Sequence, residues 1–381
     1  MVKMDSKNLE SRVQKLCREV RELSLGSNGE IDRLEGPLVP IRFLREYVMP
    51  GKPCIITGAV NHWKALQLWS NHYLASVLRD QDVSIYFTPN GFADSVVDLQ
   101  EMHSQFNCQL EKTENEEDEV SFSKQQINDR CVGNDLTAEE PRFWFVTSHV
   151  EKIPFPEALR EIVEVNKSGR GVAYAQHQNN CFLSEFGLLA SDAEVHIPWA
   201  TEAFGGLPEA VNLWIGNEKG VTSFHKDHYE NMYVMVAGEK HFTLLPPVDV
   251  HRLYVRSYPS ASFKRSQDGK TFSIEKNLPI AMVPWASVDP YPSALKEEHA
   301  IKLFPRYFQG ELPFTCTLKA GEILYLPSMW FHHVMQTPDM EGRTIAINYW
   351  YDMQFDIKYA YFNFLDSFDC ANGTSSSLSD L

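Results

Sequence analysis

Cysteine is scarce in this chain, and its spacing argues against the common cysteine-based sites. Only seven of the 381 residues are cysteines, and no two of them form a Cys-x-x-Cys pair. A zinc module or a redox motif would need such paired thiols, and an odd number of scattered cysteines is not typical of a disulfide framework. Reduced thiols are usual inside the cell, so we expect a cytoplasmic location, with the nucleus as a second one.

Long apolar runs, an apolar signal core near residue 1 and an excess of basic residues are also missing. No run is long enough to span a bilayer, so we expect no membrane association. The 35 lysines and arginines are outnumbered by 51 acidic residues, which gives a net charge of −16. This balance repels phosphate backbones, so we expect no direct binding of nucleic acid, and a basic peptide or protein is a better-matched partner.

The chain does contain a pattern of histidine and aspartate that is typical of a metal site. His225 and Asp227 follow the strand-like run 221–224, and side chains two apart on a strand share a face. His332 and His333 follow a distant strand-like run, and only one of these neighbours can point inward. Two imidazoles and one carboxylate form the facial triad of non-haem Fe(II) sites, which leaves positions open for a co-substrate and dioxygen.

Four segments carry a resemblance to a known family, namely residues 222–233, 238–242, 330–334 and 347–352. Together they resemble the JmjC oxygenases, in the branch of small hydroxylases related to factor inhibiting HIF. The resemblance implies a mainly β fold with flanking helices (α+β), built around a double-stranded β-helix, the cupin-like jelly roll of the JmjC type.

The resemblance also suggests how the chain is divided. An apolar spacing of four and three predicts a helix at 8–23, within an N-terminal segment 1–34. Residues 35–370 would form the JmjC oxygenase domain with helical additions, interrupted by an acidic insertion at about 104–142. The serine-rich end, 371–381, is predicted to be a disordered tail.

The resemblance assigns a role to each candidate site residue. It implies that Fe(II) is bound by His225, Asp227 and the first histidine of the pair, His332, while His228 points away by the same strand alternation. It also implies that the co-substrate 2-oxoglutarate is held by a further set, with Lys240 pairing with the distal carboxylate and O2 as the second co-substrate. That set is Lys240, Thr222, Tyr174, Asn231, Asn348 and Trp350.

The implied function is hydroxylation of a protein substrate. The resemblance points to (3S)-lysyl hydroxylation of a developmentally regulated GTP-binding protein. Glu230 and Asp352 stand next to the site motifs and are candidates to receive the lysine ammonium. Histone lysine demethylation and a JmjC-linked endopeptidase activity are alternatives within the enzymes. A metal-free β-barrel binding module is the alternative of another class, and a homodimer is an open alternative to a monomer.

Overall fold

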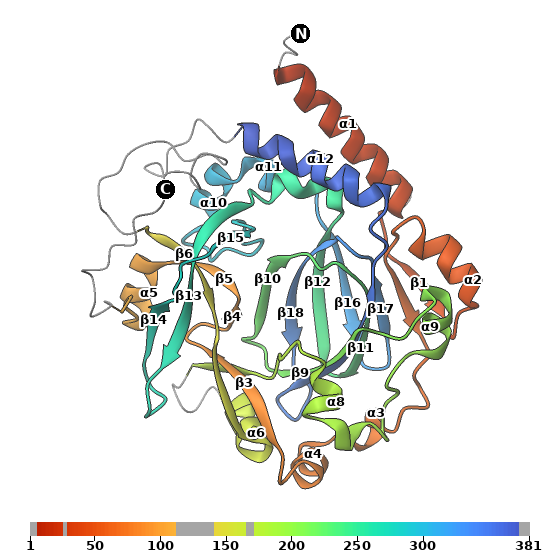
Figure 1. Ribbon diagram of the computed structural model, residues 1–381, viewed down its shortest axis with the longest axis vertical. Helices are drawn as coiled ribbons and strands as arrows, with labels where there is room; N and C mark the ends of the chain where they lie inside the picture. The colour runs from red at the N-terminus through yellow and green to blue at the C-terminus, as the bar shows by residue number, and fades with distance from the viewer. Residues whose placement is uncertain (1–5, 26–28, 112–140, 165–170, 373–381) are drawn as a thin grey trace.

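Two β-sheets lie at the centre of the computed structural model, which describes residues 6–25, 29–111, 141–164 and 171–372 (Figure 1). Across the larger sheet the strands are β1 (Asp32–Glu35), β2 (Cys54–Thr57), β17 (Ile323–Leu326), β11 (Tyr229–Ala237), β19 (Thr344–Asp352) and β9 (Ala210–Gly216). Across the smaller sheet they are β16 (Phe314–Lys319), β12 (Glu239–Leu245), β18 (Phe331–Thr337), β10 (Val221–His225) and β4 (Phe92–Ala93). Apart from the parallel pairs β1–β2 and β4–β10, neighbouring strands in both sheets are antiparallel.

The register of these strands brings distant parts of the sequence to one place. In the smaller sheet, His225 of β10 is paired with His332 of β18. In the larger sheet, Asn231 of β11 is paired with Trp350 of β19. Directly paired residues of antiparallel strands present their side chains on the same face of the sheet. Side chains separated by more than 100 positions in the chain are therefore neighbours on the inner faces of the two sheets.

Two smaller sheets extend the core on one side. One contains β14 (Phe272–Lys276), β13 (Arg256–Arg265), β6 (Phe143–Thr147) and β5 (Ser95–Asp98), with β15 (Met282–Trp285) also paired to β13. The other contains β7 (His149–Pro154), β3 (Asp82–Thr88) and β8 (Val172–Tyr174). A bridge between Ala175 and Ile215 joins the end of β8 to β9, so Tyr174 is fixed beside the larger sheet.

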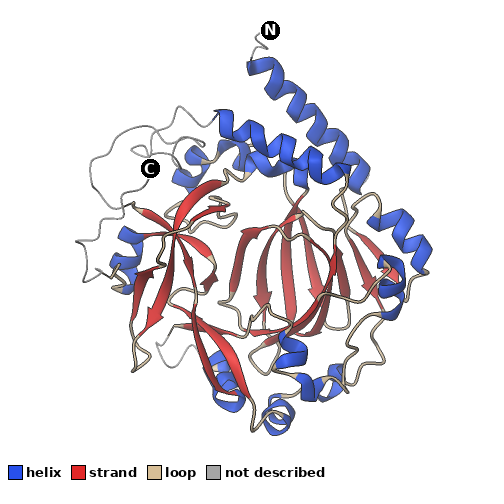
Figure 2. Ribbon diagram, in the orientation of Figure 1, coloured by secondary structure: helices blue, strands red, loops and turns tan. Residues whose placement is uncertain are grey.

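Helices surround the sheets rather than entering them (Figure 2). They are α1 (Ser6–Leu25), α2 (Pro40–Phe43), η1 (Leu44–Val48), α3 (Ala65–Leu68), α4 (Asn71–Val77), α5 (Leu99–Phe106), α6 (Phe155–Val163), α8 (Cys181–Ser184), η2 (Gly187–Leu189), α9 (Pro198–Phe204), η3 (Pro247–Arg252), α10 (Glu297–Leu303), α11 (Pro305–Phe308) and α12 (Ile357–Asn372). The end of α1 is attached to the body by a buried ion pair between Arg21 and Asp249 of η3. In the described part of the chain, none of these helices is long and apolar enough to cross a membrane.

The structure confirms the predicted fold class, a mainly β core with flanking helices. The helix α1 covers the region where a helix was predicted at 8–23. Most of the predicted acidic insertion, 112–140, lies outside the described residues, although its first residues form the end of α5. The predicted tail also lies outside them from 373 onward, and α12 continues to Asn372.

Candidate metal and co-substrate site

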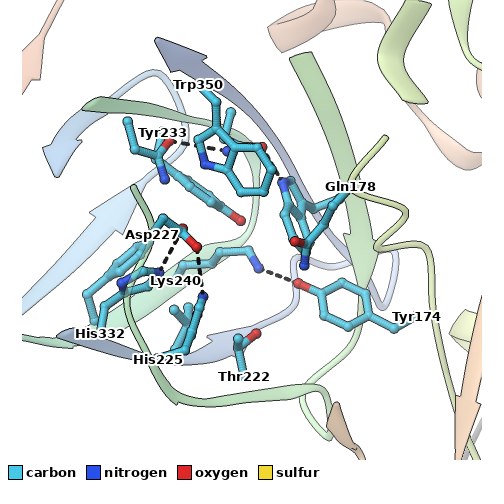
Figure 3. A pocket seen from close by; sticks show the side chains of 14 residues that line it. Tyr174, Gln178, Thr222, His225, Asp227, Tyr233, Lys240, His332 and Trp350 are labelled. Carbon is cyan, nitrogen blue, oxygen red and sulfur yellow. Dashed lines mark hydrogen bonds and ion pairs between the residues drawn. The ribbon is translucent and has the colours of Figure 1, made fainter. Parts of the chain in front are cut away.

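Three side chains that could bind one metal ion meet in a pocket between the two sheets (Figure 3). Asp227 Oδ1 lies 3.8 Å from His225 Nε2, and Asp227 Oδ2 lies 3.7 Å from His332 Nε2. One ligand atom from each residue lies within 4.8 Å of the other two. The structure therefore brings the predicted triad together, although Asp227 lies just beyond the end of β10 and not on the strand itself.

Both imidazoles direct Nε2 toward this shared point because Nδ1 is engaged elsewhere. His225 Nδ1 lies 2.9 Å from the carbonyl oxygen of Ser223, and His332 Nδ1 lies 3.1 Å from that of Trp330. A carbonyl can only accept, so each Nδ1 carries the proton and each Nε2 keeps its lone pair. Burial, with the neighbouring His225, lowers the pKa of His332 to about 4, which keeps the ring neutral at neutral pH. This donor set fits Fe(II).

The two other histidines near the triad lie outside it. His333 is buried on the opposite face of β18, where its ring lies near those of Phe224 and Tyr291. His228 packs against the ring of Phe355, just before α12, and against that of Tyr359 in the first turn of α12. Strand alternation along β18 thus separates His333 from His332, whereas His228 lies in the loop between β10 and β11 and is turned away by its packing.

Lys240 is the most unusual charged group in the pocket. Its side chain is 2% exposed, and Nζ donates a 2.6 Å hydrogen bond to the hydroxyl of Tyr174. The ammonium also lies over the rings of Tyr174, Trp214 and Tyr233, at 5.2 to 5.9 Å from their centroids. Among the described residues, no carboxylate pairs with it. Burial lowers the pKa of Lys240 to about 7, and an anion bound beside it would favour the charged form.

The remaining predicted co-substrate residues line the same pocket. Asn348 donates to Asn231 at 3.2 Å and accepts from the indole of Trp214 at 2.8 Å. Trp350 stacks on Tyr229 with ring centroids 4.9 Å apart and planes 9° from parallel. Thr222 completes the group at the wall formed by β10. The structure therefore gathers these residues around one pocket, whereas their contacts with 2-oxoglutarate stay predictions.

The pocket also includes residues that the sequence reasoning missed. These are Gln178, Trp214, Tyr233, Phe242 and Val334. The space among the lining residues, including the part open to solvent, is about 370 Å³. Alternation along β11, β12 and β18 would have given Tyr233, Phe242 and Val334, since each stands two positions from a predicted residue. Trp214 lies on β9, which carried no predicted residue. Gln178 lies in a loop, and no periodicity could have identified it.

The two carboxylates suggested for the substrate ammonium do not line this pocket. Glu230 Oε2 accepts from the hydroxyl of Tyr325 at 2.6 Å and from the amide of Ser328 at 3.2 Å, and Oε1 accepts from the Ser328 hydroxyl at 2.9 Å. Its carboxylate stabilises the turn before β18, so the proposed rim role was wrong for Glu230. Asp352 is exposed at the end of β19 and is not among the lining residues.

Comparisons with known proteins agree with this geometry. Residues 40–357 match the family model of the cupin-like domain. Lysine-specific demethylase JMJ32 of Arabidopsis thaliana is 51% identical, over 93% of this chain and 90% of that protein. The human bifunctional peptidase and (3S)-lysyl hydroxylase JMJD7 is 36% identical, over 89% of this chain and 90% of that protein. JmjC domain-containing protein E of Dictyostelium discoideum is also 36% identical, over 92% of this chain and 91% of that protein.

Proposed function

We propose, from the premise that this chain belongs to the cupin-like JmjC oxygenases, that it hydroxylates a lysyl residue of a protein substrate. The observation that carries the 2-oxoglutarate dependence is Lys240, a buried cation that hydrogen-bonds Tyr174 and has no carboxylate partner among the described residues. A buried charge without a counter-ion is costly, so such a lysine fits a site that is completed by an anionic ligand.

The residues of the pocket would divide the task between metal and co-substrate. His225, Asp227 and His332 would hold Fe(II) on one face, while Lys240 and Tyr174 would bind the distal carboxylate of 2-oxoglutarate. When bound, Fe(II) supplies the activation of O2 that couples oxidative decarboxylation of 2-oxoglutarate to hydroxylation of a C–H bond. One oxygen atom of O2 ends in succinate and the other in the new hydroxyl group, with carbon dioxide as the third product.

The protein's own contribution is placement. The backbone carbonyls of Ser223 and Trp330 fix the orientation of both imidazole rings, and the Asn231–Asn348–Trp214 chain holds the neighbouring wall rigid. Groups held in advance in this way do not need to reorganise when the reactants bind.

Two features support the choice of a lysyl substrate. One relative at 36% identity bears the name of a (3S)-lysyl hydroxylase, and it covers most of both chains. The net charge of −16 favours encounter with a cationic substrate. We extend the proposal to a developmentally regulated GTP-binding protein as the partner, in the cytoplasm or nucleus.

Lysine demethylation is the second candidate, because the relative at 51% identity is named a lysine-specific demethylase. The two reactions use the same metal and co-substrate and differ in the carbon that is oxidised. Hydroxylation of an N-methyl group would release formaldehyde, whereas hydroxylation of the lysine side chain would leave the added oxygen in the product.

One experiment with two parallel incubations separates these candidates. Purified protein with Fe(II), 2-oxoglutarate and O2 would receive two substrates in parallel, a lysine peptide from a GTP-binding protein and a methyl-lysine histone peptide. We expect succinate and a gain of one oxygen atom on the lysine peptide, both absent from Asp227→Ala. If the methylated peptide released formaldehyde and the unmodified lysine peptide gained no oxygen, demethylation would replace hydroxylation as the proposed function. Equal succinate from wild type and Asp227→Ala would refute both candidates.

A further inference from the structure

A carboxylate that the proposed reaction has not yet used lies beside the metal ligand His225. The short strand β4 pairs in parallel with β10, with Thr222 opposite Ala93, so the next residue, Asp94, reaches the level of Ser223. The Ser223 hydroxyl donates to the carbonyl oxygen of Asp94 at 2.8 Å. Asp94 is therefore held against the strand that ends in His225.

The close approach of these two strands depends on a glycine. Gly91 has a φ of +88°, and a Cβ atom added there would lie 1.9 Å from the carbonyl oxygen of Lys219. The amide of Val221 donates to the carbonyl oxygen of Gly91 at 2.9 Å. Because a side chain at this position would force the strands apart, Gly91 keeps β4, and with it Asp94, next to β10.

The charge of Asp94 has no matching cation from the protein. Its carboxylate accepts the backbone N–H of Ser148 and interacts electrostatically with His225, and it also acts on the hydroxyl of Tyr86. No lysine or arginine forms an ion pair with it in the part of the chain that the structure describes. Asp94 as a whole residue is half-buried, and burial desolvates its carboxylate. A desolvated carboxylate of this kind is best compensated by a cation from outside the chain.

Two aromatic residues lie close to the segment that carries Asp94, Trp285 through Ser223 and Tyr86 by its electrostatic interaction with Asp94. The indole of Trp285 donates to Ser223 at 3.0 Å and lies 5° from parallel to the His225 ring. Tyr86 is held by a 2.7 Å hydrogen bond between its hydroxyl and His177 Nδ1. Both rings are half-buried. Aromatic faces attract ammonium groups, so the surroundings of Asp94 combine a negative charge with rings suited to a cation.

We propose that Asp94 binds the ammonium group of the substrate lysine while the carbon to be oxidised lies at the metal site. This inference rests on the proposed function, since it presumes that a lysyl side chain enters the pocket. It places the substrate cation beside His225, at the end of the site away from Lys240, and so keeps the two cations apart. It also replaces Glu230, whose carboxylate is engaged by Tyr325 and Ser328, and Asp352, which is exposed at the end of β19.

The test measures how strongly the protein prefers a peptide with a lysine ammonium group over one that lacks it. Two peptides would be compared, one with lysine at the target position and one with norleucine, which lacks the terminal ammonium group. Their dissociation constants and their succinate production would be measured with the full-length protein in the presence of Fe(II) and 2-oxoglutarate. We expect wild type to prefer the lysine peptide by about tenfold or more, and Asp94→Asn to lose that preference.

The matched control is Asp352→Asn, which changes the net charge equally at an exposed position and should keep the wild-type preference. If Asp94 acted only by positioning His225, Asp94→Asn would lower turnover with both peptides and leave their ratio unchanged, which would overturn the proposal. Loss of preference in Asp352→Asn alone would move the cation subsite there. Preferential binding of the lysine peptide without any oxygen gain would refute the proposed function and leave the role of Asp94 standing.

Discussion

Replacement of Lys240 by methionine should weaken binding of 2-oxoglutarate and at the same time stabilise the ligand-free protein. The two effects have one origin, the burial of an ammonium group with no carboxylate partner among the described residues. Methionine has a similar length and no charge, so it fills the space without needing a counter-ion. A merely structural surface lysine would give neither effect.

The size of the stability effect follows from the pKa of Lys240. Burial lowers that pKa from 10.5 to about 7, and about 1.4 kcal/mol for each pH unit gives an upper bound of about 5 kcal/mol. Because the folded-state pKa lies below the unfolded one, this penalty is fully present below pH 7. It declines as the pH rises from about 7 to 10.5. The rings of Tyr174, Trp214 and Tyr233 favour the charged form and reduce the penalty below that bound.

The assay is urea unfolding of the ligand-free wild type and Lys240→Met at pH 6.5 and pH 9. We expect the variant to be more stable at pH 6.5 by up to about 5 kcal/mol, with the difference reduced to about 2 kcal/mol at pH 9. The 2-oxoglutarate concentration required for half-maximal turnover should rise by at least about thirtyfold, because the buried carboxylate loses a charged partner worth about 2 kcal/mol or more. Lower stability of the variant at pH 6.5, or an unchanged 2-oxoglutarate requirement, would refute this reasoning.

Three further outcomes are expected. His332→Ala should lose bound iron while His333→Ala retains it, as measured by metal analysis; the opposite pattern would move the third ligand to His333. Tyr174→Phe removes one hydrogen bond at Lys240 and should weaken 2-oxoglutarate binding by about 1 kcal/mol, as measured by calorimetry; unchanged affinity would exclude the tyrosine hydroxyl from that site. Glu230→Ala leaves the buried hydroxyl of Tyr325 without its acceptor and should lower the free energy of unfolding by about 2 kcal/mol; an equally stable variant would contradict the structural role assigned to that carboxylate.

The sequence alone was sufficient for the parts of the site that follow from strand alternation. The alternation between His332 and His333 on β18 allowed only one of them to face inward. The spacing of His225 and Asp227 also named two residues that meet, although Asp227 lies beyond the end of β10 and its position is set by the loop. Period-two patterns are local, because they depend on the pleat of a single strand. The resemblance to the JmjC oxygenases supplied the partner strand and the candidate co-substrate residues, and the family and fold it implied are confirmed.

The tertiary structure decided what depends on register, loops and the direction of individual side chains. Proximity to the motif suggested Glu230 as a substrate contact, yet its carboxylate is used by Tyr325 and Ser328. Asp94 stands in a sequence with no recognisable motif, and only the parallel pairing of β4 with β10 brings it to His225. Strand alternation can be predicted because it is fixed by the backbone within a few residues. The pairing of segments about 130 positions apart depends on packing of the whole fold, and no local pattern encodes it.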